Sequence, residues 1–243
     1  MHKLTTNVIS SLRRGNPLLL IALFLGLAGA AWATPAAVNW LSRVAIGAGG
    51  SHVQGNPAAR VRLTQYESYT CPHCAHFTAE SGPALGSRFI APGNVSVEVR
   101  HILRDPIDFA MTVAVNCGSS VRFFSRHEAM MAAQSGILAR VQALPSATIE
   151  RWGQVAGGQR LRRIADDSGV IAWMQGRGFT AAQINQCFAD GAMHQRLLAM
   201  SNAANAAGIN ATPMFAINGQ TQAIDSVYDW ATLSTALSRA VGQ

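Results

Sequence analysis

Lysine is almost absent from this chain of 243 residues, because Lys3 is the only one and all other Lys or Arg positions hold arginine. Internal repeats and low-complexity tracts are also absent. The densest basic cluster, Arg160, Arg162 and Arg163, has neither interleaved aromatic residues nor a nucleic-acid-binding motif beside it. Such a cluster is typical of a solvated helix face, so we do not expect nucleic acid as a partner.

Cysteine is scarce too, and two of the four cysteines, Cys71 and Cys74, are separated by only two residues. Together with His73 and His76 they offer the donor types that bind zinc. A structural zinc site usually brings a second ligand pair at comparable spacing, and none follows here. A c-type haem is disfavoured because Ala75 stands where that motif requires histidine. The pair therefore indicates thiol–disulfide exchange, and we expect neither a metal nor a cofactor.

The first 33 residues have the composition of an export signal. Three basic side chains precede an uninterrupted apolar run from Pro17 to Trp32, and Ala31-Trp32-Ala33 fits cleavage after Ala33. We interpret residues 1–33 as a secretory signal peptide. The alternative is an uncleaved membrane anchor, since about 17 apolar residues are just enough to span a bilayer. Either form exports the remaining chain, with a net charge of +4, to an oxidising compartment.

The cysteine pair stands where a predicted strand, Val61 to Tyr66, meets a helix predicted over 72–90 with a kink at Ser81-Gly82-Pro83. If Cys71 is the N-cap, Pro72 occupies the first helical position, where its missing N–H costs nothing.

In that position the Cys71 sulfur faces the free amides of His73 and Cys74 and the positive end of the helix dipole. Both stabilise a thiolate and so lower its pKa. His73 adds a donor, or a positive charge when protonated. Each unit by which the pKa falls makes the pair more oxidising by roughly 30 mV.

The remaining cysteines, Cys117 and Cys187, are 70 positions apart. In an exported chain they form either a structural disulfide or two buried free thiols. A bridge would close a loop worth roughly 4 kcal/mol in the chain-entropy model and would take no part in turnover.

Elsewhere the pattern alternates between strands and a long helical region. Residues 34–54 form an N-terminal extension in which 36–44 is a predicted helix. Val95 to Arg100 alternates as a strand with one buried side does. No convincing strand falls between Asp105 and Gly208, where helix-spaced apolar residues dominate and Thr180 with Gln183 forms a capping box.

The predicted sheet resumes after Gly208, which suits a helix C-terminus. Met214 to Ile217 is predicted as an apolar strand, and Asn218-Gly219 is a strong hairpin signal that pairs it with 221–225. A final helix is predicted from Tyr228 to Ala240.

Three of these features together resemble the DsbA-like branch of the thioredoxin superfamily. They are Cys71-Pro72-His73-Cys74 at a strand-to-helix junction, the helical insertion, and Thr212-Pro213 ahead of a hairpin. The resemblance implies an α/β, thioredoxin-like domain over 55–104 and 209–243, with an inserted helical subdomain over 105–208.

The resemblance also implies roles for individual residues. Cys71 would be the exposed nucleophile, Cys74 the buried resolving thiol, and Pro213 a cis-proline facing them. The Thr212 backbone would pair with an extended substrate as one more short strand.

One position departs from the family pattern. Members often carry a buried acid six residues before the first cysteine, where this chain has Gln65. Glu67, two residues on and on the same strand face, is the replacement we consider for accepting the proton of the buried thiol.

The function implied is that of a monomeric or weakly oligomeric periplasmic oxidase, which donates the Cys71–Cys74 disulfide to unfolded exported proteins with free thiols. A DsbB-type, quinone-linked membrane partner would reoxidise it. Two alternatives stay open: a disulfide isomerase or reductase of the same superfamily, and a non-catalytic exported module that binds metal or client proteins.

Overall fold

The computed structural model describes residues 38–223 and 229–242. The chain divides into two units at Val38, and the second, Asn39–Gln243, is compact and contains all described helices and strands. The predicted signal peptide or anchor over 1–33 lies outside the described residues. Within the described part, no helix combines the length and the apolar character needed to cross a bilayer.

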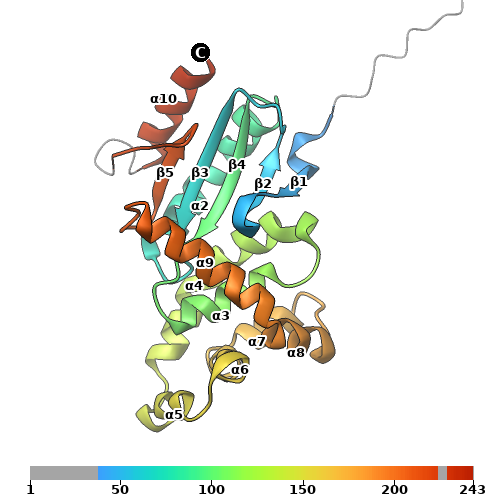
Figure 1. Cartoon of the computed structure of the whole chain (residues 1–243), viewed down its shortest axis with the longest axis vertical. Helices are drawn as coiled ribbons and strands as arrows, with labels where there is room; N and C mark the ends of the chain where they lie inside the picture. The colour runs from blue at the N-terminus through green and yellow to red at the C-terminus, as the bar shows by residue number, and fades with distance from the viewer. Residues whose placement is uncertain (1–37, 224–228, 243) are drawn as a thin grey trace, which may run out of the picture. The chain divides into compact units, whose positions relative to one another are not determined.

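A six-stranded sheet forms the centre of the second unit, with strand order β1-β2-β4-β3-β5-β6 (Figure 1). The two central strands, β3 and β4, run parallel, and every other neighbouring pair is antiparallel. A parallel pair needs a crossover, which helix α2 provides. The strands are β1 (Val44–Ile46), β2 (His52–Gly55), β3 (Val61–Glu67), β4 (Val95–His101), β5 (Met214–Ile217) and β6 (Gln220–Thr221).

The N-terminal extension is part of this sheet, which corrects the helix predicted over 36–44. In the described part of that range, residues 38–44, the regular structure consists of the 3₁₀ turn η1 (Trp40–Ser42) and the first residue of β1. The chain then reverses through η2 (Ala48–Gly50), where Gly49 and Gly50 have positive φ. Glycine tolerates that conformation, so β1 and β2 form a hairpin whose second strand pairs with β4. Tertiary pairing therefore overrides the weak local helical preference.

Strand β4 is also more deeply buried than its alternating sequence predicts. Six of its seven residues are buried, including the polar Ser96 and Glu98, so the prediction of a single buried side was wrong. The reason is that Glu98 has hydrogen-bonding partners on its own face. Its carboxylate accepts from Ser51 Oγ at 2.6 Å and from Arg100 Nε at 2.9 Å. A buried charge is tolerated when it is paired in this way.

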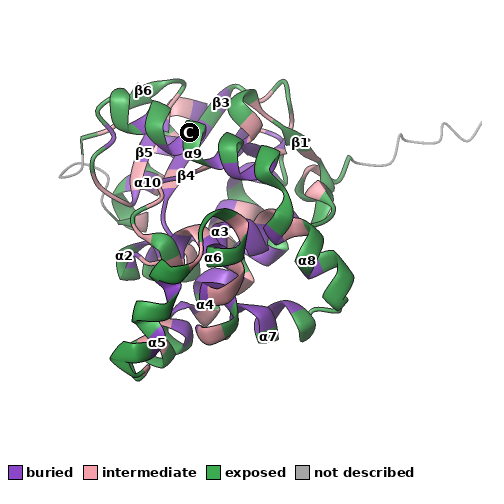
Figure 2. Ribbon diagram, turned by 60° about the horizontal axis from the view of Figure 1, so that its bottom comes forward, coloured by how far each residue is buried: buried purple, intermediate pink, exposed green. Residues whose placement is uncertain are grey.

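No strand falls within the predicted helical insertion over 105–208, all of whose residues are described. Its helices share one hydrophobic core with the sheet, and Figure 2 shows buried segments on both helices and strands. Helix α4 contacts α2, and α9 contacts β4. The helices are α3 (Pro106–Asn116), α4 (Phe123–Gln142), α5 (Ser146–Arg151), α6 (Gly157–Asp167), α7 (Val170–Gln175), α8 (Ala181–Ala189) and α9 (Gly191–Ala206).

Local signals set several element ends as predicted. The Thr180–Gln183 capping box begins α8, and Gly208, with a φ of 84°, follows the end of α9. Asn218 and Gly219 both have positive φ, as a tight hairpin turn between β5 and β6 requires.

Pairing extends only over Gln220–Thr221, and residues 224–228 of the predicted partner strand and helix start lie outside the described residues. Helix α10 (Trp230–Val241) follows and contacts α2 and β3.

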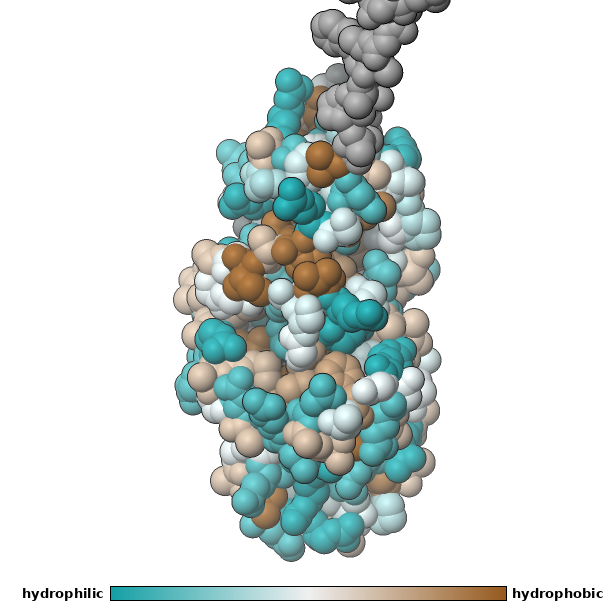
Figure 3. All heavy atoms as spheres, turned by 90° about the vertical axis from the view of Figure 1, so that its right-hand side faces the viewer, coloured by the Kyte–Doolittle hydropathy of each residue, from teal (hydrophilic) through white to brown (hydrophobic). Residues whose placement is uncertain are grey.

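Apolar side chains are exposed at the β1 edge of the sheet, on the face shown in Figure 3. Ile46 on β1 is 58% exposed and Val121, in the adjoining 3₁₀ turn η4 (Ser120–Arg122), is 60% exposed. Strand β1 lies at the opposite end of the strand order from β5 and β6. Strands β2 and β4 lie between this apolar edge and β3, the strand that leads to the cysteine pair.

The structure joins Cys117, which follows α3, to Cys187 in α8 by a disulfide. We expect the Cys117→Ala/Cys187→Ala variant to lose roughly 4 kcal/mol of unfolding free energy, because the bridge closes a long loop in the unfolded chain. Urea unfolding without reductant measures this loss. Comparison in a Cys71→Ala/Cys74→Ala background removes any contribution of the second pair, and superimposable unfolding curves would contradict a stabilising role.

Candidate active site

The cysteine pair sits at the N-terminus of α2 (Pro72–Ala84), directly after β3. Cys71 is the N-cap in extended conformation, and Pro72 is the first helical residue. Pro83 lies inside α2, which continues directly into the π-helix η3 (Leu85–Ile90). Both Cys71 and Cys74 are free thiols here.

Cys71 is less accessible than the family resemblance implies. It is 3% exposed, against 0% for Cys74, so the expectation of an openly exposed nucleophile is corrected. The cause is the segment before β5, where the Thr212–Pro213 peptide bond is cis. The Cys71 sulfur lies 3.2 Å from the Thr212 carbonyl oxygen, to which it donates when protonated, and this contact covers the sulfur.

Several donors lower the pKa of Cys71 to about 5. The largest contribution is a hydrogen bond from the Cys74 thiol, which outweighs the opposing effect of burial. The Thr212 side chain contributes next, followed by the backbone amides of Cys74 and His73. The sequence predicts the amides, together with the helix dipole and the His73 side chain, so the neighbouring thiol and Thr212 are additions from the structure.

The second thiol shifts in the opposite direction. Burial raises the pKa of Cys74 well above its ordinary value, and the hydrogen bond to Cys71 and the negative charge of Glu67 raise it further. At neutral pH the pair therefore holds one thiolate, on Cys71, and one proton, on Cys74. This asymmetry suits Cys71 to leave as an anion and Cys74 to stay protonated until it reacts.

A groove of about 510 Å³ opens beside Cys71. Exposed Pro72 and His73 form one wall, and the Thr212 segment forms another. The other lining residues are Ile102, Arg104, Asn205, Asn210 and Ala211. Met214, by contrast, packs with Ile102 and Ile209 in a small buried cluster.

Two aspartates that sequence reasoning missed anchor the loop before Cys71. Asp108 is fully buried and accepts from Ser68 Oγ at 2.6 Å and from the Tyr69 amide at 2.9 Å. Burial raises its pKa to about 7 despite these donors. Asp105, the N-cap of α3, accepts from Thr70 Oγ1 at 2.6 Å. Asp105 followed directly by Pro106 is a sequence signal for a helix N-terminus and could have marked Asp105 as a cap.

Helix α4 supplies two further residues that the sequence did not identify. Gln134 Nε2 donates to the Cys71 carbonyl oxygen at 2.9 Å, which fixes the backbone of the N-cap. His127 Nε2 lies 3.0 Å from Glu67 Oε2, and its Nδ1 lies 2.8 Å from the Tyr69 hydroxyl. Tyr69 is fully buried, so it packs beneath the loop and does not reach a substrate surface.

His76, whose side chain offers a metal-binding donor near the cysteines in sequence, is exposed on α2 and lies 3.9 Å from Glu80. Among residues 38–223 and 229–242, no three His, Cys, Asp or Glu side chains are grouped as a metal site requires.

Fold and site together define a thioredoxin-fold protein with a helix-capping dithiol opposite a cis-proline. A family model described as Thioredoxin matches residues 48–239. The chain belongs to this family, and its architecture is that of the DsbA-like members.

Three similar proteins illustrate the relationship. A protein-disulfide isomerase from Novosphingobium aromaticivorans, known from a crystal structure, is 34% identical, with a TM-score of 0.75 over 80% of this chain and 98% of that one. Wolbachia pipientis alpha-DsbA1 is 17% identical over 79% of this chain and 91% of its own, with a TM-score of 0.62, which supports the fold alone. A Rickettsia typhi protein named "Putative protein-disulfide oxidoreductase" is 25% identical over 191 residues, or 78% of this chain. The chain spans 61% of that relative's length.

Because the Thr212 side chain helps to lower the pKa of Cys71, we expect Thr212→Val to raise it. Thiolate absorbance at 240 nm, followed from pH 3 to 9 in reduced protein, should give a midpoint near 5 in the wild type and a higher one in the variant. Thr235→Val makes the same change on α10, where the hydroxyl bonds only Ala231, and should leave the midpoint unmoved. An unshifted Thr212→Val titration would remove this residue from the stabilisation of the thiolate.

The depressed pKa also links ionisation to stability. A group whose pKa falls on folding stabilises the folded state above its unfolded pKa, and this contribution disappears as the pH drops through the folded value. We expect reduced protein to lose this stabilisation between about pH 9 and 5, and Cys71→Ser protein to lack that part of the pH dependence. Thermal unfolding across this range measures the difference between the two proteins.

Proposed function

We propose that this protein is a periplasmic thiol:disulfide oxidase, which donates its Cys71–Cys74 disulfide to unfolded exported proteins. The proposal is carried by the opposed pKa shifts of the two thiols, Cys71 lowered and Cys74 raised, beside a groove of about 510 Å³. A thiolate favoured in the reduced protein makes the disulfide form a good oxidant. The pKa of Cys71 is about 5, two units below pH 7. This difference makes the Cys71–Cys74 disulfide more oxidising by roughly 60 mV.

The reaction proceeds by two exchanges. A substrate thiolate attacks the Cys71 sulfur, the Cys71–Cys74 bond breaks, and Cys74 takes up a proton. A second substrate thiolate then attacks the substrate's own sulfur in the mixed disulfide, which releases Cys71 as a thiolate. The substrate loses two electrons and the protein gains them, so no further cofactor is required.

The groove and the cis-proline segment position the substrate in this scheme. The residues that carry the exchange are Cys71 and Cys74, with Pro72 and His73 on the exposed wall next to the sulfur. The Thr212 and Pro213 segment offers its backbone to an extended chain as an added strand. A substrate that displaces the Thr212 carbonyl from the Cys71 sulfur would also uncover the nucleophile.

Turnover requires reoxidation of the two thiols. We propose a DsbB-type, quinone-linked membrane protein as the oxidant, in line with the export signal or anchor predicted over 1–33. This partner and the compartment rest on the sequence pattern and on the family resemblance.

A second candidate function is disulfide isomerisation, which the name of the Novosphingobium protein, a protein-disulfide isomerase, favours at 34% identity. The two functions differ in the redox potential that they need. An isomerase is less oxidising and must be kept reduced, whereas an oxidase passes its disulfide on.

Equilibration of the Cys71–Cys74 pair with glutathione tests the proposal, with the thiol content read by alkylation and mass spectrometry. We expect a potential near the strongly oxidising end of the superfamily, around −120 mV. A value near −270 mV, typical of thioredoxin, would contradict the oxidase. Cys71→Ala should abolish oxidation of a reduced model protein, while Cys117→Ala/Cys187→Ala should retain it.

Alkylation of the same purified protein distinguishes an exchange enzyme from a passive binding module. Rapid alkylation of Cys71 at pH 6 is expected from its pKa of about 5. A module that only holds metal or client chains has no need of an ionised thiol and would react slowly at that pH.

A further inference from the structure

A pocket of about 560 Å³ lies between the loop that follows β4 and the first turns of α6 and α9. We call it the α6–α9 pocket. Its walls come from three stretches of the chain, residues 103–109, 157–161 and 189–198. The first stretch includes the start of α3, a helix that contacts both α6 and α9. A pocket of this size has room for a small organic ligand.

A buried histidine with an unused ring nitrogen lines this pocket. His194 of α9 is 7% exposed, and its Nε2 atom has no hydrogen-bond partner among the described residues. The neighbouring ring atom, Cε1, faces the start of α6, since a Cβ atom at Gly158 would lie 3.5 Å from it. A buried polar atom of this kind calls for an explanation, and a ligand that bonds it is one.

The other ring nitrogen determines how Nε2 can meet a ligand. Burial lowers the pKa of His194, against the opposing effects of Asp190 and of a hydrogen bond with the Cys187 backbone. Because Nε2 has no partner in the described part of the chain, Nδ1 makes that bond and donates to the carbonyl oxygen. Nε2 is therefore an acceptor in the neutral ring and becomes a donor when the ring is protonated.

Two arginines without an acidic partner stand at the same pocket. Arg104 precedes α3, and Arg160 is the fourth residue of α6. Both are exposed, and neither forms an ion pair within the described residues. The acidic side chain among the lining residues, Asp105, is already engaged as the cap of α3 and by Thr70. The positive charge of the arginines is therefore not neutralised inside the pocket.

The start of α6 adds to this positive potential. Its N-cap, Ala156, has no side chain that can accept from the first amides, and no acid occupies the first turn. Helix starts usually carry a capping oxygen or an acid, because their free amides and the helix dipole attract negative charge. Here the first turn is followed directly by the cationic Arg160, so the negative charge that this helix start favours is missing from its own sequence.

Apolar side chains complete the lining of the pocket. Leu161 is buried, Leu103 and Phe109 are half-buried, and Leu198 is 36% exposed. The Phe109 ring packs edge-on against His194, with the ring centroids 5.6 Å apart. An apolar surface beside cationic groups suits a molecule with an apolar body and one acid group.

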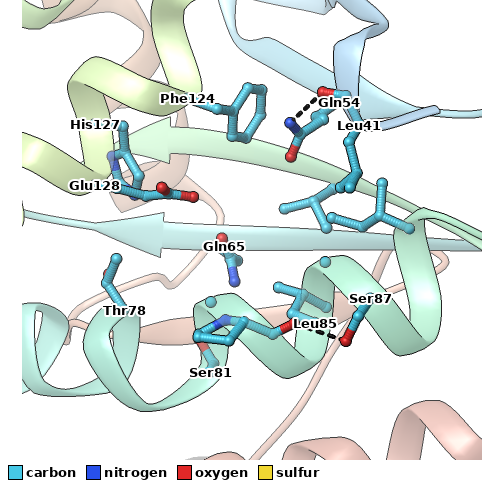
Figure 4. A pocket seen from close by; sticks show the side chains of 15 residues that line it. Leu41, Gln54, Gln65, Thr78, Ser81, Leu85, Ser87, Phe124, His127 and Glu128 are labelled. Atoms are coloured by element: carbon cyan, nitrogen blue, oxygen red, sulfur yellow. Dashed lines mark hydrogen bonds between the residues drawn. The ribbon is translucent and has the colours of Figure 1, made fainter. Parts of the chain in front are cut away.

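The cavity drawn in Figure 4 lacks this combination. It has a volume of about 310 Å³ and lies between α2 and α4, where Gln65, Thr78 and His127 line it. None of its lining residues, all within the described part of the chain, is an arginine, and Glu128 contributes an acid. An anionic ligand therefore suits the α6–α9 pocket and not this cavity.

We propose that the α6–α9 pocket binds the carboxylate of an apolar organic acid. The carboxylate lies between Arg104, Arg160 and the uncapped amides of α6, and the protonated ring of His194 donates to it through Nε2. Arginine and helix-start amides are common partners of carboxylates. The apolar body of the ligand packs on Phe109 and Leu161.

Two sources can supply such a carboxylate, a free acid or a polypeptide. Arg104 also lines the groove beside Cys71, so a chain bound in that groove has access to the α6–α9 pocket. The inference goes beyond the proposed exchange function and does not rest on it, because binding at the pocket needs neither active-site sulfur.

The experiment titrates phenylacetate into the oxidised full-length protein. Calorimetry measures the affinity, and the NMR signal of the His194 Cε1 proton, assigned by its loss in His194→Phe, locates the ligand. We expect this signal to shift to saturation, and the neutral phenylacetamide to bind about tenfold more weakly because it lacks the charge. Equal affinity for the acid and the amide, or saturation without a shift of His194, would overturn the proposal.

A pair of variants on α6 tests the role of the arginine. Arg160→Gln should weaken phenylacetate binding about tenfold, since it removes a charge-assisted hydrogen bond. Arg162→Gln removes a charge from the same helix, but this guanidinium is already paired with Asp166 at 3.8 Å and does not line the pocket. Its affinity should match the wild type. Wild-type affinity in Arg160→Gln, or equal weakening in both variants, would contradict the assignment.

His194→Phe separates binding from packing. The new ring keeps the shape that packs on Phe109, and loss of a buried atom without a partner should leave the thermal stability at least as high as in the wild type. Phenylacetate should nevertheless bind more weakly. Reduced stability together with wild-type affinity would make His194 a packing residue and refute its role in the site.

The pH dependence of binding adds a second readout for the histidine. Affinity should tighten as the pH falls from about 8 to 6, because the carboxylate favours the protonated ring. The other charged groups around the ring are Arg104 and Arg160, which stay charged, and Asp105 and Asp190, which cap α3 and α9. We expect His194→Phe to lose this dependence, and its persistence in the variant would refute proton uptake at His194.

A tripeptide that ends in phenylalanine distinguishes the two sources. Displacement of phenylacetate by the peptide with a free C-terminal carboxylate, but not by its amide, would identify polypeptide carboxylates as ligands. Binding of phenylacetate without competition from the peptide would identify a free acid. If neither compound binds, the proposal is wrong. Cys71→Ala/Cys74→Ala protein should bind like the wild type, so failure at this pocket leaves the exchange function untouched.

Discussion

The hydrogen bond between the two active-site sulfurs is the interaction on which the site depends. It is the largest contribution to the lowered pKa of Cys71, and it also raises the pKa of Cys74. A single contact thus separates the two ionisations, because the proton that stabilises one sulfur as an anion is held on the other. Backbone amides at the N-terminus of α2 add to this effect but rank below it.

This contact requires that Cys71 be fixed against several distant parts of the chain. Asp105 and Asp108 from α3 hold the preceding loop, and Gln134 from α4 holds the Cys71 carbonyl. All three residues come from the helical insertion, whose apolar side chains share one core with the sheet. The insertion therefore fixes the position of the dithiol and packs against the elements that carry it.

Short-range sequence signals predicted the parts of the fold that depend on local chemistry. The N-capping Cys71 with Pro72, the Thr180–Gln183 capping box and the Asn218-Gly219 turn each act through neighbouring residues. The β1–β2 hairpin was missed, since its pairing with β4 joins residues more than forty positions apart.

The same limit explains which site residues were missed. Asp108 and Gln134 have no distinguishing sequence context in their helices, and only tertiary packing brings them to the loop around Cys71. His127 carries no local signal either, because nothing in its neighbouring sequence connects it to β3. Its contact with Glu67 spans 60 positions and could not be inferred from spacing. The thiol–thiol hydrogen bond was likewise hidden, because it depends on side-chain directions within the first helical turn.

In this chain the buried acid of β3 stands at position 67, and position 65, where family members often have it, holds glutamine. A shift of two residues keeps the same strand face and displaces the side chain by about 6.6 Å along β3. Gln65 borders the cavity shared with Thr78, whereas the charge of Glu67 reaches Cys74. The cost of burying a carboxylate at 67 requires a partner on the facing helix, and His127 of α4 occupies that place. A carboxylate at 67 and a histidine at 127 therefore make physical sense as a pair, since either one alone would leave a buried polar group without its partner.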